Sequence, residues 1–197
     1  MIRPLRIAVA DDERDMRDYF QTILPRLGHV VSAAARDGLE LIDACRAETP
    51  DLIITDVKMP GLDGIEAARR IYERTPVPII LVSAHHDADV LERAGREHIL
   101  AFLVKPIKQA DVEPAIVVAV SRFEQFQALR KETADLRQAL EDRKLIEKAK
   151  GLLMRRTGLG ETDAFRRLQR LASDRNRKLV DIAQMILTAD EAFQADA

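Results

Sequence analysis

Residues 52–64 read LIITDVKMPGLDG, and this stretch decides the fold of the first part of the chain. The apolar run 52–55 is followed at once by Asp56 and then by a turn rich in Pro and Gly. A short apolar run bounded by turn residues is typical of a strand that is buried on both faces. Apolar residues at helical spacing follow from Ile65 to Ile71, so the pattern predicts a strand, a loop and a helix.

The same alternation of strand and helix extends over the first 120 residues. Five apolar runs predict strands, at Leu5–Ala10, Val30–Ala34, Leu52–Thr55, Pro78–Ser83 and Leu100–Val104. Helical spacing follows the first three runs, and Asp-Gly pairs punctuate the connections. Strands that alternate with helices imply an α/β fold with a doubly wound, five-stranded parallel sheet, whose ligands bind at the carboxyl ends of the strands.

Composition and charge exclude several classes of protein. Hydrophobic residues make up 47% and charged residues 32%, which excludes collagen-like, mucin-like and wholly disordered chains. The longest apolar stretch, 115–120, is far shorter than the roughly 18 residues of a membrane span. No secretory signal is evident, and Cys45 is the single cysteine, so a cytoplasmic protein without disulfides is expected.

The net charge of −2 hides an asymmetry along the chain. Residues 1–120 carry a net charge of −5, residues 121–180 carry +7 and residues 181–197 carry −4. A basic unit therefore follows an acidic one, and an anionic partner is expected for the basic unit. The alternative is a helix face whose basic side chains only contact solvent.

Polar residues stand at the ends of four predicted strands. They are Asp11, Asp12 and Glu13 after the first, Asp56 after the third, Ser83 after the fourth and Lys105 after the fifth. Converging carboxylates repel one another unless a cation lies among them, and oxygen ligands suit Mg²⁺. With an ammonium and a hydroxyl nearby, such a site could clamp a phosphoryl group and use Asp56 as the nucleophile. For any single residue, a solvated loop position is an alternative.

These motifs resemble the receiver domain of two-component response regulators. The resemblance rests on DDE at 11–13, ITDVKMPGLDG at 54–64, VSAHH at 82–86 and FLVKPI at 102–107. It implies that Asp56 accepts the phosphoryl group from a sensor histidine kinase. It also implies that Asp11, Asp12, Asp56 and the backbone carbonyl of Lys58 bind Mg²⁺. Ser83 and Lys105 would bind the phosphoryl group, Phe102 would be the switch aromatic, and Lys58 and His85 would tune the lifetime of the phosphoryl group.

A long helix is predicted after the sheet. From Ile116 the apolar residues lead into Leu129, Leu136 and Leu140, spaced at three and four residues among charged neighbours. This spacing predicts a short coiled coil over 121–142 and hence a homodimer. A helix that packs only on its own domain is the alternative, because barely two heptads are visible.

Three further apolar stripes predict a small three-helix bundle over 143–190. The breaks fall at Gly158-Leu159-Gly160 and at Arg175-Asn176-Arg177. Basic side chains lie opposite the stripes and would suit phosphates. The residues expected to bind RNA are Lys144, Lys148, Lys150, Arg155, Arg166, Arg167, Arg170, Arg175, Asn176, Arg177 and Lys178. Asn176 is the candidate for reading bases, because an amide both donates and accepts hydrogen bonds.

This unit is similar to the ANTAR domain, a three-helix output domain of antiterminator regulators. The strongest parts are AKGLLM at 149–154, the pair Ala164-Phe165 and ASDRNRKLVDIA at 172–183. The resemblance implies binding of paired stem-loops in nascent mRNA, so that a terminator hairpin cannot form. Hairpin recognition agrees with the general preference of RNA-binding proteins for exposed loop bases.

The sequence as a whole predicts a phosphorylation-controlled response regulator that acts by transcription antitermination. The expected division is a receiver at 1–120, a helical linker at 121–142, an RNA-binding bundle at 143–190 and an acidic tail at 191–197. No enzymatic activity is expected beyond accepting the phosphoryl group on Asp56 and losing it slowly. A DNA-binding response regulator and a phospho-switch that sequesters a protein are the alternatives.

Overall fold

A computed structural model describes residues 3–84 and 99–194, and the chain divides into two compact units, Met1–Gln127 and Ala128–Ala197. The strands are β1 (Arg6–Ala10), β2 (Val30–Ala35), β3 (Leu52–Asp56), β4 (Ile79–Ser83) and β5 (Ala101–Val104). The helices are α1 (Arg14–Arg26), α2 (Gly38–Ala47), α3 (Gly64–Arg74), α5 (Gln109–Thr157), α6 (Glu161–Asp174) and α7 (Leu179–Gln194).

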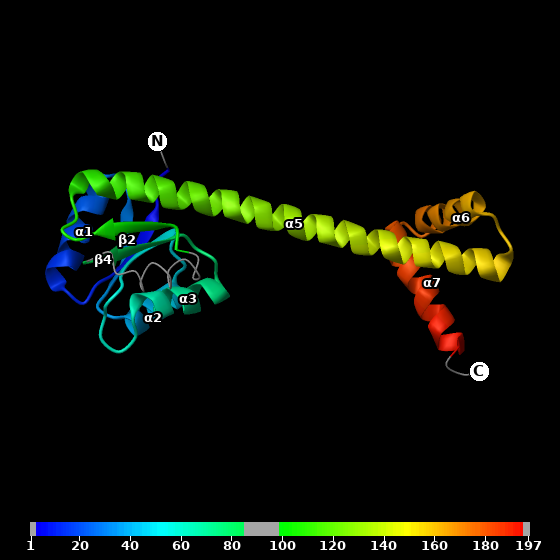
Figure 1. Cartoon of the computed structure of the whole chain (residues 1–197), viewed down its shortest axis with the longest axis horizontal. Helices are drawn as coiled ribbons and strands as arrows, with labels where there is room; N and C mark the ends of the chain where they lie inside the picture. Colours follow the sequence, from blue (N-terminus) through cyan, green and yellow to red (C-terminus); the bar gives the residue numbers. More distant parts are fainter. Residues whose placement is uncertain (1–2, 85–98, 195–197) are drawn as a thin grey trace. The chain divides into compact units, whose positions relative to one another are not determined.

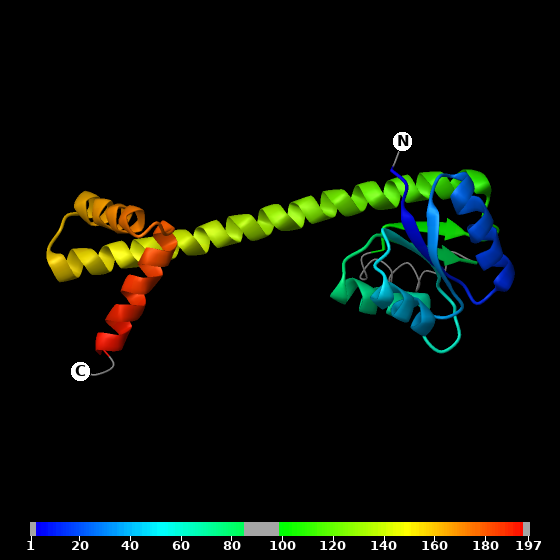
Figure 2. The same ribbon diagram turned by 180° about the vertical axis from the view of Figure 1, so that it is seen from behind.

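The first unit contains the predicted five-stranded parallel sheet, in the order β2-β1-β3-β4-β5. Helices α1 and α5 cover one face and α2 and α3 cover the other, as Figures 1 and 2 show from opposite sides. Every residue of β3 and β4 is buried, which is why these strands are almost continuously apolar. The fold class predicted from the alternating pattern is therefore confirmed.

The two Asp-Gly pairs start helices on one face of the sheet. The Asp37 carboxylate accepts hydrogen bonds from the backbone N–H groups of Leu39 and Glu40 at the start of α2, and Asp63 caps α3 in the same way. Such caps satisfy N–H groups that have no partner within the helix. Gly64 must be glycine, because a Cβ atom there would overlap the backbone carbonyl of Asp56.

The second unit contains the end of α5 together with α6 and α7. Its core consists of Ala149, Leu168, Ala172, Ile182 and Ala183, with larger apolar side chains around them. The small alanines allow the helices to pack closely. The sequence predicted three separate stretches here, but the first of them is the uninterrupted continuation of α5. Among the described residues, no helix is long and apolar enough to cross a membrane.

Asn176 lies in the turn between α6 and α7 and has a positive φ of 49°. The backbone N–H of Asn176 donates to Ser173 and that of Arg177 donates to Ala172, the pattern of a Schellman cap at the end of α6. Asparagine tolerates this left-handed conformation better than most residues. The backbone therefore gives a structural reason for the residue type that the sequence pointed to for base reading.

Candidate functional site

The carboxyl ends of β1, β3 and β5 bring three charged groups together. The ammonium nitrogen Nζ of Lys105 lies 3.1 Å from Asp11 Oδ2 and 3.2 Å from Asp56 Oδ1. Nζ also donates a hydrogen bond of 3.0 Å to Glu13 Oε1. Asp11 is fully buried and Asp56 is 6% exposed. One cation thus holds three carboxylates at the sheet edge where ligands of this fold bind.

Backbone hydrogen bonds fix the orientation of these carboxylates. The N–H of Glu13 donates to Asp11 Oδ1, and the N–H of Lys58 donates to Asp56 Oδ2, both at 2.9 Å. The β4–β5 ladder continues for one more bond, from the N–H of Lys105 to the carbonyl of Ser83. The strand ends therefore preorganise the group before any ligand arrives.

The charges in this cluster shift one another's protonation. Burial raises the pKa of Asp11 and of Asp56 above the ordinary carboxyl value, and Lys105 counteracts part of that rise. Burial opposes the charge on Lys105, but hydrogen bonds and attraction to the carboxylates outweigh it and raise the pKa of its ammonium. A buried carboxylate pair with one shared cation is where a further positive charge would be favourable.

The residues fit a divalent cation. Asp11, Asp12 and Glu13 can each place one carboxylate oxygen within 4.8 Å of the others. Oδ2 of Asp11 is buried and has no hydrogen-bond partner among the described residues, although Lys105 lies beside it. Carboxylate oxygens are the hard ligands that Mg²⁺ prefers. The N–H of Lys58 faces Asp56, and binding of the metal by the carbonyl of Lys58 stays a prediction.

A pocket of about 350 Å³ opens at these residues, and Ser83, which is 9% exposed, lines it together with Asp56, Lys58 and Lys105. Phe102 lies on β5 outside this pocket and is 37% exposed. His85 lies outside the described residues. Glu13 was predicted among the strand-end carboxylates, but the resemblance gave it no role; in the structure its carboxylate pairs with Lys105.

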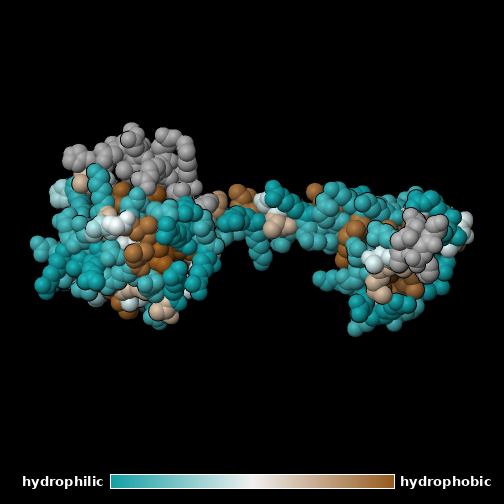
Figure 3. Space-filling model, turned by 90° about the horizontal axis from the view of Figure 1, so that it is seen from below, coloured by the Kyte–Doolittle hydropathy of each residue, from teal (hydrophilic) through white to brown (hydrophobic). Residues whose placement is uncertain are grey.

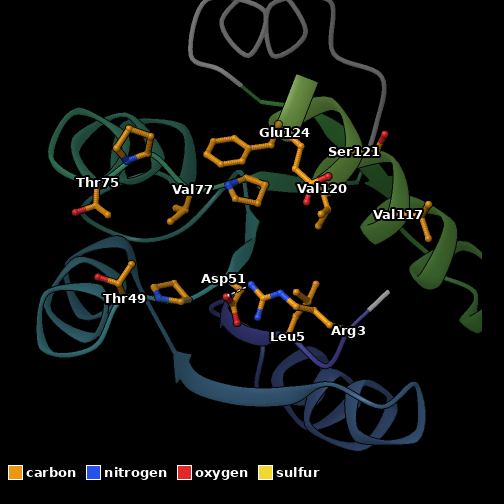
Figure 4. Close-up of a pocket in the computed structure, with 14 residues that line it drawn as sticks. Arg3, Leu5, Thr49, Asp51, Thr75, Val77, Val117, Val120, Ser121 and Glu124 are labelled. Atoms are coloured by element: carbon orange, nitrogen blue, oxygen red, sulfur yellow. Dashed lines mark hydrogen bonds and ion pairs between the residues drawn. The ribbon is translucent and has the colours of Figure 1, made fainter. Parts of the chain in front are cut away.

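A second pocket, of about 560 Å³, lies at the opposite end of the sheet, where β1, β3 and β4 begin (Figure 4). The ion pair between Arg3 and Asp51 and the apolar side chains Leu5 and Val77 line it, and Val120 closes it from α5. It is separated from the carboxylates by the length of the strands and does not belong to their site.

Of the eleven residues predicted to bind RNA, ten are exposed in the second unit. Lys150 is the exception: it is 9% exposed, and its ammonium pairs with Glu147 at 2.6 Å and Glu161 at 2.7 Å. Lys150 therefore joins α5 to α6 through Glu161, and its contact with phosphates stays a prediction. Helical spacing placed it opposite the apolar stripe but gave no sign of its acidic partners.

The fold, the strand-end site and the helical unit define a response regulator with a receiver domain. Residues 7–117 match the response regulator receiver domain family and residues 134–187 match the ANTAR domain family. The chain belongs to the response regulators of the receiver–ANTAR type.

The relatives agree with this assignment. The chain is 41% identical over 184 residues to the transcriptional regulatory protein PdtaR of Mycobacterium tuberculosis (strain CDC 1551 / Oshkosh), covering 93% of this chain and 90% of PdtaR. A receiver domain protein from Clostridium thermocellum is 29% identical, with a TM-score of 0.55 over 61% of this chain and 98% of that one. A LuxR-family regulator from Aurantimonas sp. SI85-9A1 is 27% identical, with a TM-score of 0.56, covering 60% and 86%.

Proposed function

We propose that this protein is a phosphorylation-controlled antiterminator in which Asp56 accepts a phosphoryl group from a sensor histidine kinase. The observation that carries the first half of the proposal is the convergence of Asp11, Asp56 and Lys105 at one sheet edge. We further propose the division into a receiver (1–120), a helical linker (121–142), an RNA-binding bundle (143–190) and an acidic tail (191–197). Residues 191–194 of that tail continue helix α7.

In the proposed transfer, a carboxylate oxygen of Asp56 forms a bond to phosphorus while the phosphorus–nitrogen bond of the donor's phosphohistidine breaks. The bonding electron pair stays on the imidazole nitrogen, and an acyl phosphate forms. Lys105 is placed to neutralise charge on the phosphoryl oxygens. Mg²⁺, held by Asp11, Asp12 and Asp56, would stabilise the same oxygens as a Lewis acid. We assign no further enzymatic reaction beyond slow loss of this group.

Phosphorylation adds a charge of roughly −1.5 to −2 at Asp56. Ser83 would move toward the phosphoryl group and Phe102 would turn inward from its half-exposed position on β5. To convert the output from mostly off to mostly on, the phosphoryl group must favour one state by about 5.5 kcal/mol. Helix α5 begins beside this region and continues into the second unit, so it is the proposed carrier of the change.

The second half of the proposal is that the ANTAR unit binds paired stem-loops in nascent mRNA. Exposed basic side chains on α5, on α6 and in the turn before α7 support binding to phosphates. The turn between α6 and α7 has four residues, 175–178, and includes the break predicted at Arg175-Asn176-Arg177. A short turn is also a feature of helix-turn-helix proteins, so duplex DNA belongs among the test ligands.

We propose a homodimer through 121–142. Leu129, Leu136 and Leu140 are 61%, 60% and 59% exposed, although such side chains are normally covered. Figure 3 shows apolar surface on the otherwise hydrophilic middle part of α5. Glu132 and Arg137, five residues apart beside this seam, have the charges that pair between two parallel, in-register helices.

Phosphorylation is tested by adding acetyl phosphate and Mg²⁺ and measuring the intact mass. The wild-type protein should gain one phosphoryl group, EDTA should prevent the gain, and folded Asp56→Asn should gain none. A phosphoryl group on Asp56→Asn would place the acceptor elsewhere.

RNA binding is tested by titrating the phosphorylated protein with paired hairpin RNAs and with duplex DNA of equal length at two salt concentrations. Tighter binding to the hairpins supports the proposal. Tighter binding to the duplex would favour a DNA-binding regulator, and no binding to either would favour a protein-sequestering switch.

A further inference from the structure

Gly151 stands in the middle of α5's basic stripe, with Lys148 before it and Arg155 after it on the same helix face. Glycine lowers the stability of a helix interior, so a glycine at this position needs an explanation. Its φ is not among the positive values of the described residues. A Cβ atom at this position would meet only Arg155 Nη1, at an ordinary 3.7 Å. Neither backbone conformation nor packing therefore requires glycine.

A pocket of about 300 Å³ lies directly at Gly151. Leu152 of α5 and Leu187 of α7 provide its apolar surface. This volume is at the small end of sites that hold organic ligands. The missing side chain lets a flat group lie against the helix backbone, and the pocket gives that group a place to enter.

The walls of the pocket carry both signs of charge. Lys148 and Arg155 line it from α5 together with Glu147, whose carboxylate pairs with Lys150 at 2.6 Å. Asp190 and Glu191 line it from α7. Arg156 holds Asp190 in place, because its Nε and Nη2 donate to Asp190 Oδ1 at 3.0 and 2.7 Å. This ion pair fastens the end of α7 to α5, so the pocket is formed before a ligand binds.

We propose that this Gly151 pocket receives one unstacked loop base of the bound RNA, and that the base is guanine. The proposal rests on the RNA-binding function proposed above and names the part of the RNA that this pocket reads. The ring would lie over Gly151 between Leu152 and Leu187, and the phosphates beside it would pair with Lys148 and Arg155.

Guanine follows from the carboxylate of Glu191. An ionised carboxylate only accepts hydrogen bonds, and it accepts two when two donors are adjacent. Guanine presents N1–H and the N2 amino group side by side on its Watson–Crick edge. Adenine, cytosine and uracil each place an acceptor next to their donor, which would repel the carboxylate. Asp190 acts as a positioning residue through its ion pair with Arg156.

The test uses the full-length phosphorylated protein and a pool of paired stem-loop RNAs with randomised loops, from which bound sequences are selected and read. One loop position should be enriched in guanine. Replacing that guanine by inosine, which lacks the N2 amino group, should weaken binding about tenfold, the value of one charged hydrogen bond. In Glu191→Gln the inosine penalty should fall below twofold.

Gly151→Ala separates the proposed site from a purely structural glycine. The variant should melt at the wild-type temperature or above it, because alanine favours helix, yet bind the selected RNAs at least tenfold more weakly. Gly160→Ala is the matched control, since nothing lies within 4 Å of a Cβ atom there, and its affinity should stay within twofold.

The outcomes distinguish the two proposals. Unchanged affinity of Gly151→Ala, or an equal inosine penalty in wild type and Glu191→Gln, would overturn the guanine pocket while leaving RNA binding intact. Selection of no RNA by the wild-type protein would overturn both the pocket and the proposed function.

Discussion

Replacing Lys105 by Met should destabilise the first unit because it removes the one cation shared by three carboxylates. Lys105 lies 3.1 Å from Asp11, 3.2 Å from Asp56 and 3.0 Å from Glu13. Methionine keeps most of the apolar stem, so the change removes charge with little loss of packing.

The size of the effect follows from burial. Removing one partner of a buried ion pair costs about 3–5 kcal/mol, because the remaining charge has no counterpart. The Lys105 side chain is 17% exposed and that of Glu13 is 62% exposed, so water screens part of the loss. We therefore expect the lower limit, about 3 kcal/mol, which lowers the melting temperature of a unit of this size by roughly 10 °C.

The loss of stability in Lys105→Met should increase as the pH rises. Burial already raises the pKa of Asp11 and Asp56 above the unfolded value, so the folded state favours their protonated forms. Stability is then highest below the unfolded pKa of these groups and declines as pH rises through their folded pKa. Without Lys105 both pKa values rise further. The deficit should therefore be larger at pH 7 than at about pH 5, where the raised carboxyls hold more protons.

Thermal denaturation of Lys105→Met and of Lys108→Met, an exposed lysine three residues away, provides the measurement. Comparing the melting temperatures of the two variants at each pH removes the general effect of pH on the protein. Millimolar Mg²⁺ should narrow the difference at pH 7, since a bound cation restores positive charge beside Asp11. Equal melting temperatures of the two variants would refute the electrostatic account of the site. A difference in melting temperature that changes with neither pH nor Mg²⁺ would refute it as well.

Three further predictions concern the remainder of the chain. Leu136→Lys with Leu140→Lys should convert the proposed dimer to a monomer in light scattering, while Gln138→Lys should leave the mass unchanged. Arg167→Glu should weaken hairpin binding and flatten its salt dependence in titrations, with a change in stability within about 0.5 kcal/mol. Leu168→Ala empties a fully buried position and should cost about 2–5 kcal/mol. Circular dichroism should then show a melted second unit that no longer binds RNA, while the first unit is still phosphorylated.

The sequence by itself determined the sheet and the place of its site. Apolar runs mark the strands, and a parallel sheet gathers the carboxyl ends of its strands at one edge. Asp11, Asp56 and Lys105 each stand at the end of a predicted strand, so their convergence could be predicted without coordinates. The ends of α5 and α6 could also be predicted, because the glycines at 158 and 160 and the polar turn at 175–177 interrupt the apolar stripes.

Only the tertiary structure decided which charged groups are paired and which face solvent. Helical spacing places Lys150 opposite the apolar stripe, yet the start of α6 brings Glu161 onto it and buries it. Arg156 meets Asp190 across 34 residues for the same reason. Periodicity reports the side of a helix on which a residue lies, whereas an ion pair depends on how two helices pack, and that packing follows from the whole core.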